Sequence, residues 1–278
     1  MSDVIDANIA VHSALAETYN TDEPHFRPEN KAKVSKRLAE LQAMTGGDRL
    51  LDLGCGTGFI IDLARPYFNE IHGIDITPAM LSQVDADGHD ITIHQGQVEQ
   101  LPFDDGSFDA ASAYSFLDHL EDTSKMVAEA ARVLRPGGAL YIDLVPNRFY
   151  WTRIGDATLH PQFELSAFAR REFDMVTEND KRIEEKYGVD ATTFRKAEPA
   201  KEARGVDPFA FKEVALANGF AGCDIRFDWF LGNAKVLHQQ SVEDAAIIDR
   251  YLQESLPYSL DLFKYVWFVL KKEARSDD

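Results

Sequence analysis

The stretch that decides the fold is LLDLGCGTGF, residues 50–59. Its apolar first half is typical of a buried strand, and the glycines that follow predict a turn into a helix. Gly54, Gly56 and Gly58 have no Cβ, so the backbone there can adopt conformations closed to other residues and can approach a bound molecule closely. The stretch therefore predicts a ligand-binding loop between a strand and a helix.

The spacing of these glycines separates the nucleotide cofactors. A dinucleotide-binding fold of the dehydrogenase kind places its third glycine, or an alanine, at the position that is Phe59 here. The third glycine instead falls at position 58, and no Gly-Lys-Ser/Thr follows that would mark a phosphate-binding Walker loop. Both of these cofactor classes are disfavoured.

The composition is that of a packed globular protein. The chain has 278 residues, 45% of them hydrophobic, which suits one large α/β domain or a domain plus a cap. Its formal net charge of -18 would repel a polyanion, so we expect neither nucleic acid nor a membrane as partner. No apolar run is long enough to span a bilayer and the N-terminus is acidic, so we expect a cytosolic protein. Cys55 and Cys223 form neither a disulfide framework nor a metal-ligand set, and we expect no metal.

Strand and helix patterns alternate through the chain. Strands are predicted at 49–53, 70–75, 90–94, 108–114, 138–145, 223–229 and 264–270. Helices are predicted at 4–20, 28–44, 58–66, 78–85, 122–134, 207–218 and 241–254. This alternation predicts a parallel sheet with helices on both faces and a binding crevice at the carboxyl ends of its strands.

Several motifs in a fixed order resemble those of a known family. LDLGCGTG at 51–58 is similar to motif I of the class I S-adenosylmethionine-dependent methyltransferases, and the similarity continues through about residues 45–145. Further matches are Ile74-Asp75, GQVEQLPF at 96–103, FDAASAY at 108–114 with SFLDHL at 115–120, and LRPGG at 134–138. The chain resembles in particular the small-molecule methyltransferases of ubiquinone and menaquinone biosynthesis. The resemblance implies a Rossmann-like α/β fold with a doubly wound, mostly parallel seven-stranded sheet and helical lid insertions, S-adenosylmethionine as cofactor and S-adenosylhomocysteine as product.

The cofactor positions follow from the resemblance and, at Asp75, also from spacing. Asp75 closes the second strand, where nucleotide-binding α/β folds place an acid for the ribose hydroxyls. Helix capping is the alternative, although Thr77 is better placed for that role. Gln97 stands where the family usually has Asp, and its amide oxygen can accept from the adenine amino group while Val98 offers its backbone N–H; a polar surface turn is the alternative. The predicted cofactor set is Asp52, Gly54, Cys55, Gly56, Gly58, Asp75, Ile76, Gln97, Val98, Tyr114, Tyr19 and Arg27.

An aromatic and basic cluster near the N-terminus contains Tyr19, His25, Phe26 and Arg27. In related enzymes an aromatic and an arginine from this region often close over the cofactor. Arg27 offers bidentate geometry to the methionyl carboxylate, and an aromatic face can lie against the sulfonium. A helix that only docks on the sheet edge is an equally open interpretation.

His119, with Asp118 beside it, is the candidate for proton transfer. It is the histidine that the motif order places at the crevice, and many relatives carry His-His where this chain has Asp118-His119. A neutral imidazole can take a proton from an acceptor hydroxyl. Capping or packing of the following helix is the alternative for this histidine.

Segments outside the core are predicted to enclose the acceptor, because methyl transfer is an in-line displacement that needs a dry, aligned site. We expect an N-terminal helical lid at 1–45, the cofactor-binding core at 46–145, an insertion or substrate cap at 146–206, and the rest of the sheet at 207–278 with a second lid segment at about 231–258. Aromatic residues in these lid segments could line an apolar pocket, which indicates a small organic acceptor methylated at O, N or C. His160 or His238 is an alternative base. The other interpretation is that the aromatic residues belong to the ordinary hydrophobic core. The aromatic residues are Tyr150, Trp151, Phe163, Phe168, Trp229, Phe230 and Phe263.

Three rival functions have recognisable sequence requirements. A nucleic-acid amino-methyltransferase would carry an Asn/Asp-Pro-Pro-aromatic element after the fourth strand, where this chain has Tyr114-Ser115-Phe116-Leu117. An aminopropyl transferase would place a pair of acids there, and only Asp118 is present. A non-catalytic cofactor-binding module would keep the glycine loop and Asp75 but have no enclosed second pocket.

Overall fold

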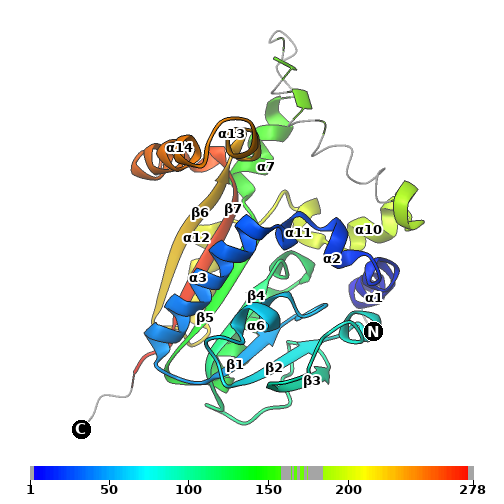
Figure 1. Cartoon of the computed structure of the whole chain (residues 1–278), viewed down its shortest axis with the longest axis vertical. Helices are drawn as coiled ribbons and strands as arrows, with labels where there is room; N and C mark the ends of the chain where they lie inside the picture. Colours follow the sequence, from blue (N-terminus) through cyan, green and yellow to red (C-terminus); the bar gives the residue numbers. More distant parts are fainter. Residues whose placement is uncertain are drawn as a thin grey trace.

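A seven-stranded sheet in the order β3-β2-β1-β4-β5-β7-β6 forms the centre of the computed structural model (Figure 1). The structure describes residues 3–157 and 184–274, together with residues 164, 166, 167, 170, 171 and 174. The strands are β1 Arg49–Leu53, β2 Glu70–Asp75, β3 Asp90–Gln95, β4 Phe108–Tyr114, β5 Leu134–Pro146, β6 Gly222–Phe230 and β7 Phe263–Lys271. The helices up to the fifth strand are α1 Asp3–Leu15, α2 Tyr19–Asp22, η1 Pro24–Phe26, α3 Pro28–Thr45, α4 Phe59–Ala64, α5 Pro78–Leu81, η2 Leu117–His119 and α6 Thr123–Val133. Those after it are α7 Arg148–Ala157, α10 Ala191–Ala197, α11 Pro199–Glu202, α12 Pro208–Ala217, α13 Asn233–Gln239, α14 Val242–Glu254 and η3 Leu260–Leu262.

The strand order places a binding crevice beside β1. Strands β1 to β5 pair in parallel, and β7 pairs antiparallel with both β5 and β6. The order runs outward from β1 to β3 on one side and from β4 on the other, so it reverses between β1 and β4. Ligands of open α/β sheets bind outside the carboxyl ends of the strands at such a reversal. The predicted doubly wound, mostly parallel sheet is confirmed.

Helices cover both faces of this sheet. Helices α3 and α4 pack with Leu50 and Ile71 on one face, whereas α6 and α12 pack with Leu51 and Leu53 on the other. Successive side chains of a strand point to opposite faces, so the apolar run of β1 contributes to both layers. This is why the strand before the glycine loop has leucines at positions that face both layers.

Several boundaries differ from those predicted. The first helix ends at Leu15, and Tyr19–Asp22 forms the separate short helix α2. The helix predicted at 78–85 ends at Leu81. Strand β5 already begins at Leu134, because Phe108 pairs with Leu134 before the register shifts to Ala110 and Ala139. The residues predicted as a tight turn therefore form a bulge within the paired strand, which is possible because Gly137 takes a φ of +77°.

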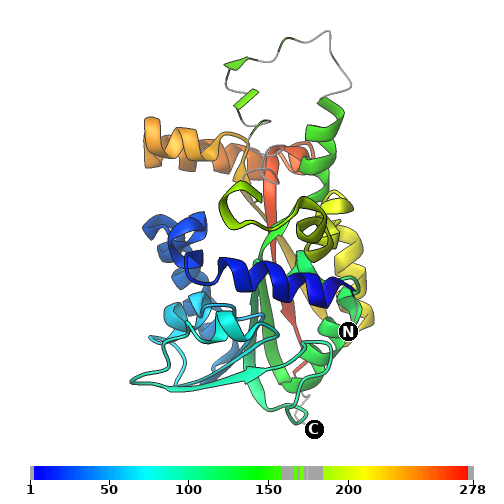
Figure 2. The ribbon, with the colours of Figure 1, turned by 90° about the vertical axis from the view of Figure 1, so that its right-hand side faces the viewer.

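The N-terminal helix and the end of the insertion pack together. Apolar residues of α1 (Ala7, Val11 and Leu15) form a cluster with Phe194 and Ala197 of α10, and Figure 2 shows α1 crossing the molecule beside these helices. Helices α13 and α14 lie at the far end of β6 and β7, away from β1 to β3 (Figure 1). Within the described part of the chain, no helix combines the length and apolar character needed to cross a membrane.

Candidate functional site

The glycine loop connects β1 to α4 in a conformation that requires its glycines. The φ angles are +68° at Gly54, +52° at Gly56 and +90° at Gly58, a region that L side chains rarely adopt. A Cβ at Gly54 would also lie 2.1 Å from a ring carbon of Phe116. The Gly54 N–H donates to the carbonyl of Ile74 at 2.8 Å, so the loop is fixed to the end of β2.

Asp75, the last residue of β2, binds the loop and the start of α5. Its Oδ2 accepts from the Gly56 N–H at 3.0 Å, and its Oδ1 accepts from the Thr77 N–H at 2.8 Å. Thr77 occupies the N-cap position of α5, as the sequence indicated, but its side chain makes no capping bond. Burial raises the pKa of Asp75, and the two backbone donors oppose that rise. Each carboxylate oxygen has a second lone pair, which leaves room for a cis-diol.

A second carboxyl group, that of Asp52, lies within β1 beneath the loop. It is 1% exposed, and Ser112 Oγ donates to its Oδ1 at 2.8 Å. Burial raises the pKa of Asp52 to about 7, the bond from Ser112 opposes this rise, and the charge of Asp75 adds to it. Two carboxyl groups that disfavour each other's ionisation therefore lie at the base of the loop.

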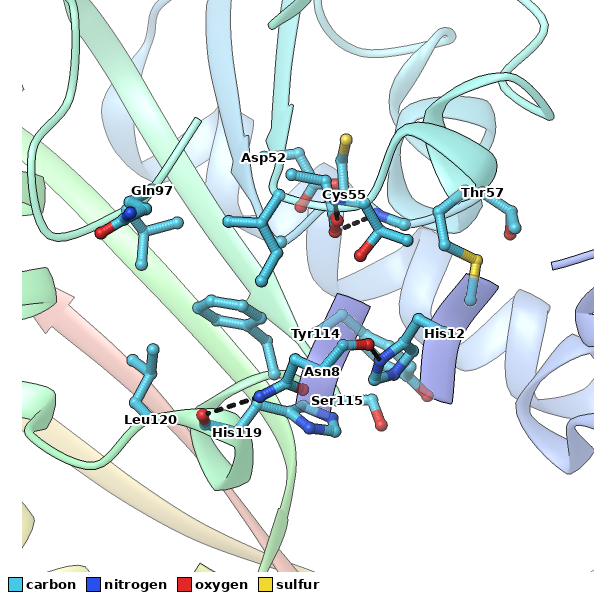
Figure 3. A pocket seen from close by; sticks show the side chains of 18 of the residues that line it. Asn8, His12, Asp52, Cys55, Thr57, Gln97, Tyr114, Ser115, His119 and Leu120 are labelled. Carbon is cyan, nitrogen blue, oxygen red and sulfur yellow. Dashed lines mark hydrogen bonds between the residues drawn. The ribbon is translucent and has the colours of Figure 1, made fainter. Parts of the chain in front are cut away.

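One cavity collects most of the predicted cofactor residues. Its empty volume is about 1050 Å³, open solvent at its mouth included. The predicted residues that line it are Asp52, Gly54, Cys55, Gly56, Asp75, Ile76, Gln97, Val98, Tyr114, Tyr19 and His119. Figure 3 shows Asp52, Cys55 and Thr57 on one side of the cavity and Asn8, Ser115 and His119 on the opposite side.

Three predicted residues do not line this cavity. Gly58 is the N-cap of α4, behind the part of the loop that faces the cavity. Arg27 is exposed at the start of α3, so the structure does not bring its guanidinium to the site. Asp118 is buried in the wall, 5% exposed, although its neighbour His119 lines the cavity.

The adenine segment after β3 is held at the cavity by backbone and side-chain bonds. The Gly96 N–H donates to the carbonyl of Asp75 at 3.0 Å. Val98 is buried, and both Gln97 and Val98 line the cavity. A little further along, Glu129 of α6 accepts from the Leu101 N–H at 2.7 Å. The backbone of the segment is thus attached at both ends.

Aromatic side chains from the N-terminal segment join the glycine loop. Tyr19 and His25 line the cavity, and their rings meet edge to face at 5.7 Å. His25 also contacts the Tyr114 ring, and burial lowers the pKa of His25 to about 4, so it is neutral at pH 7. The Thr57 hydroxyl donates to Asn20 Oδ1 at 2.6 Å, which ties α2 to the loop.

Helix α1 supplies two polar residues that sequence reasoning missed. Asn8 Nδ2 donates to the carbonyl of His119 at 3.5 Å, and His12 Nδ1 donates to the carbonyl of Asn8 at 3.0 Å. The His12 and His119 rings meet edge to face at 4.9 Å. Ile5, Asn8 and His12 line the cavity at a spacing of three to four residues, which is one face of a helix. The spacing of four between the polar residues Asn8 and His12 within this helix was the signal available in the sequence.

His119 is held in one tautomer. Its Nδ1 lies 2.9 Å from the carbonyl oxygen of Ala197. A carbonyl oxygen can only accept, so Nδ1 carries the proton of the neutral ring and Nε2 keeps its lone pair. The end of the insertion therefore orients the histidine that the sequence singled out.

The aromatic residues expected to form an acceptor pocket do not line the cavity where the structure describes them. Tyr150, Phe230 and Phe263 are buried in the interior, which is the alternative that the sequence left open. His238 is half exposed and lies 3.4 Å from Glu29, away from the cavity. The structure likewise brings no residue of 231–258 to the cavity. Phe163, Phe168 and His160 lie outside the described residues.

The lining is acidic. Asp52, Asp75, Glu99 and Glu121 line the cavity, and no lysine or arginine is among the described residues that do. Such a field favours a cationic ligand group and disfavours an anionic one. The sulfonium of S-adenosylmethionine suits it, whereas its methionyl carboxylate must rely on backbone N–H groups and neutral side chains.

Comparisons with known proteins agree with this geometry. Residues 51–142 match the family described as "Methyltransferase domain". The chain is 32% identical over 161 residues to a protein of Mycolicibacterium smegmatis described as a probable S-adenosylmethionine-dependent methyltransferase, covering 56% of this chain and 61% of that protein. It is 34% identical over 139 residues to the 27-O-demethylrifamycin SV methyltransferase of Amycolatopsis mediterranei, covering 46% of this chain and 51% of that protein. It is 27% identical over 168 residues to the ubiquinone biosynthesis O-methyltransferase of Pseudomonas aeruginosa, covering 56% of this chain and 71% of that protein. The chain thus spans less than two thirds of the first two relatives.

Solved structures show the same fold. A SAM-dependent methyltransferase from Archaeoglobus fulgidus aligns with a TM-score of 0.51 at 18% identity, covering 87% of this chain and 94% of that one. A second S-adenosylmethionine-dependent methyltransferase, from Mesorhizobium loti, aligns with a TM-score of 0.52 at 18% identity, covering 85% of this chain and 96% of that one. The glycine loop, the acid at the end of β2, the sheet order and the matched sequence all lead to one assignment. Residues 51–142 match a methyltransferase domain and are similar in sequence to S-adenosylmethionine-dependent methyltransferases, within a sheet of the order found for this fold.

Proposed function

We propose that this protein transfers the methyl group of S-adenosylmethionine to a small organic acceptor. The observation that carries the proposal is that the glycine loop, Asp75 and the Gln97-Val98 segment line the same cavity as His119 and helix α1. One end of the cavity has groups for a nucleoside, and the other end has room and polar groups for a second molecule. A module that only bound the cofactor would not need that second end.

The cofactor end follows from the donors and acceptors present. The Asp75 carboxylate accepts from the two ribose hydroxyls, and Gln97 and Val98 contact the adenine edge. The Gly54–Gly56 backbone and Tyr19 surround the methionyl part, with the acidic lining around the sulfonium.

The acceptor end centres on His119. In the transfer, the carbon–sulfur bond breaks with its electron pair left on sulfur, and a lone pair of the acceptor forms the new bond to carbon. When the acceptor is a hydroxyl, its proton passes to His119 Nε2, the ring nitrogen that the bond to Ala197 leaves with a lone pair. Asp118, buried behind His119, adds negative charge that favours the resulting imidazolium.

We further propose lids and a location. Helix α1 lies over the cavity, and the carbonyl of Ala197 holds His119. We therefore propose the segments 1–45 and 146–206 as lids that exclude water, the second on the evidence of its described end. One relative is named a 27-O-demethylrifamycin SV methyltransferase and another a ubiquinone biosynthesis O-methyltransferase, which supports a small acceptor. The net charge of -18 argues against nucleic acid, and the two free cysteines suit the cytoplasm.

Calorimetry with S-adenosylmethionine and S-adenosylhomocysteine tests the cofactor, and a labelled-methyl screen of phenols, sugars, quinol precursors, amines and carboxylates tests transfer. We expect both cofactors to bind and at least one neutral acceptor to be labelled. With that acceptor, His119→Gln should lower kcat by about 100-fold or more while leaving cofactor affinity unchanged. Absence of binding at high micromolar cofactor would reject the whole proposal, and unaltered turnover in His119→Gln would reject the base.

A further inference from the structure

We propose that Asp118, His119 and Glu198 form a binding site for a divalent cation in the wall of the cavity. One potential ligand atom from each lies within 4.8 Å of those of the other two. Asp118 and His119 belong to η2, whereas Glu198 directly follows α10 at the end of the insertion. We expected no metal from the sequence, because its two cysteines form no metal-ligand set; Glu198 lies far along the chain from Asp118 and His119.

The state of Asp118 is the first argument for a cation. Asp118 is 5% exposed, and its Oδ1 is buried without a hydrogen-bond partner among the described residues. Glu198, the second carboxyl group of the site, is 8% exposed. The unpartnered oxygen of the buried Asp118 carboxylate is costly, and a second buried carboxyl group close to it adds repulsion. A cation between them would remove both penalties.

The state of His119 is the second argument. Histidines that bind metals usually donate their other ring N–H to a carboxylate or a backbone carbonyl, which fixes the ring and its tautomer. His119 makes this bond from Nδ1 to the carbonyl of Ala197 at 2.9 Å. The ring is therefore already held with a lone pair on Nε2, the form that a metal ion requires.

The ligand set indicates the kind of cation. One imidazole and two carboxylates suit Mn²⁺, Fe²⁺ or Zn²⁺, whereas Ca²⁺ and Mg²⁺ prefer oxygen ligands throughout. Three protein ligands leave positions open for water or an acceptor oxygen.

The position of the site suggests two effects. A cation there would join η2 to the residue after α10 and so fix the insertion against the core. Resting on the proposed methyl transfer, it would also place positive charge beside the acceptor end of an otherwise acidic cavity and lower the pKa of an acceptor hydroxyl. The cation and the acceptor proton would then compete for the same lone pair of His119.

The test measures Mn²⁺ binding to the full chain without any cofactor or acceptor. Protein stripped with a chelator is titrated with MnCl₂ at 150 mM salt (about physiological ionic strength), which weakens non-specific binding to the acidic surface, and free Mn²⁺ is followed by electron paramagnetic resonance. We expect one saturable site per chain. Glu198→Gln and Asp118→Asn should each weaken it at least about tenfold. Glu254→Gln, an exposed carboxylate at the end of α14, should leave it unchanged.

Equal affinity in the wild type, Glu198→Gln and Asp118→Asn would overturn the proposal, as would the lack of a saturable site at millimolar Mn²⁺. Circular dichroism and S-adenosylmethionine binding of each variant verify the fold, and Glu198→Gln keeps the test valid if Asp118→Asn fails to fold. Because no methyl transfer is measured, failure here leaves the proposed function standing, and failure to bind the cofactor leaves the cation result standing.

Discussion

Replacing Asp75 by Asn removes one acceptor oxygen while keeping the size of the side chain. The carboxylate accepts from the Gly56 and Thr77 N–H groups at 3.0 and 2.8 Å, and it would accept from the ribose diol in addition. In the variant, an amide NH₂ faces one of those backbone N–H groups, and at most one ribose hydroxyl keeps its acceptor. Loss of one hydrogen bond to a charged group costs about 1.5–3 kcal/mol, which is about a 10- to 150-fold rise in Kd.

Calorimetry at pH 7.5 with S-adenosylmethionine, S-adenosylhomocysteine and methylthioadenosine measures this effect. All three carry the same ribose, so we expect their Kd values to rise by similar factors. Asp87→Asn, an exposed carboxylate on the turn after α5, serves as the control and should not alter binding. A Kd within about threefold of the wild type for all three ligands would refute the ribose assignment, and a change for methionyl ligands alone would refute it as well.

Two further substitutions test the loop and the charge beneath it. Gly54→Ala should lower the free energy of unfolding by more than Gly56→Ala, as measured by urea titrations without ligand. Both substitutions place an L residue in the left-handed region, which costs about 1–2 kcal/mol, but only at Gly54 does the new Cβ also meet Phe116. Equal losses of stability would contradict this reasoning. Asp52→Asn should stabilise the protein at pH 8 by about 2–4 kcal/mol. The pKa of Asp52 is about 7 in the folded state. Between about pH 4 and 7, Asp52 therefore keeps its proton in the folded state, whereas it has lost it in the unfolded chain. Wild-type stability consequently falls as the pH rises from about 4 to 7. The difference between the variant and the wild type, from urea unfolding at each pH, should vanish near pH 4, and a constant difference would exclude this origin.

The strands and the cofactor end were predictable because their signals are local. Strand β1 is apolar because both of its faces are buried, and its glycines follow at once, so ten consecutive residues specify strand, loop and helix start. Asp75 was found in the same way, as the residue that ends the next strand. Helix ends were predicted less well, because the separation of α2 from α1 depends on packing against the loop and not on the period of apolar residues.

The aromatic residues show why composition alone misplaced the acceptor pocket. Phe230 and Phe263 are large and apolar, which suits a pocket and a core equally well. In the structure both side chains are buried in the hydrophobic core that contains residues of β6 and β7. Arg27 was predicted from its type and neighbourhood, but a charged residue at a helix start is as easily left in solvent. Neither error could be avoided without knowing which segments fold over the crevice.

The acceptor end of the cavity depends on contacts between segments that the sequence does not connect. His119 acquires its orientation from Ala197, 78 residues away, and its carbonyl contacts Asn8, 111 residues away in the other direction. A local pattern can identify a histidine at a crevice, but it cannot say which ring nitrogen keeps the lone pair or which carboxylates surround it. These are the features that decide between a proton acceptor and a metal ligand. Most of the proposed cofactor residues lie within 52–98, whereas the proposed acceptor end draws on α1, η2 and the residue after α10. We therefore expect substitutions in α1 or at Glu198 to change acceptor chemistry without disturbing the cofactor loop.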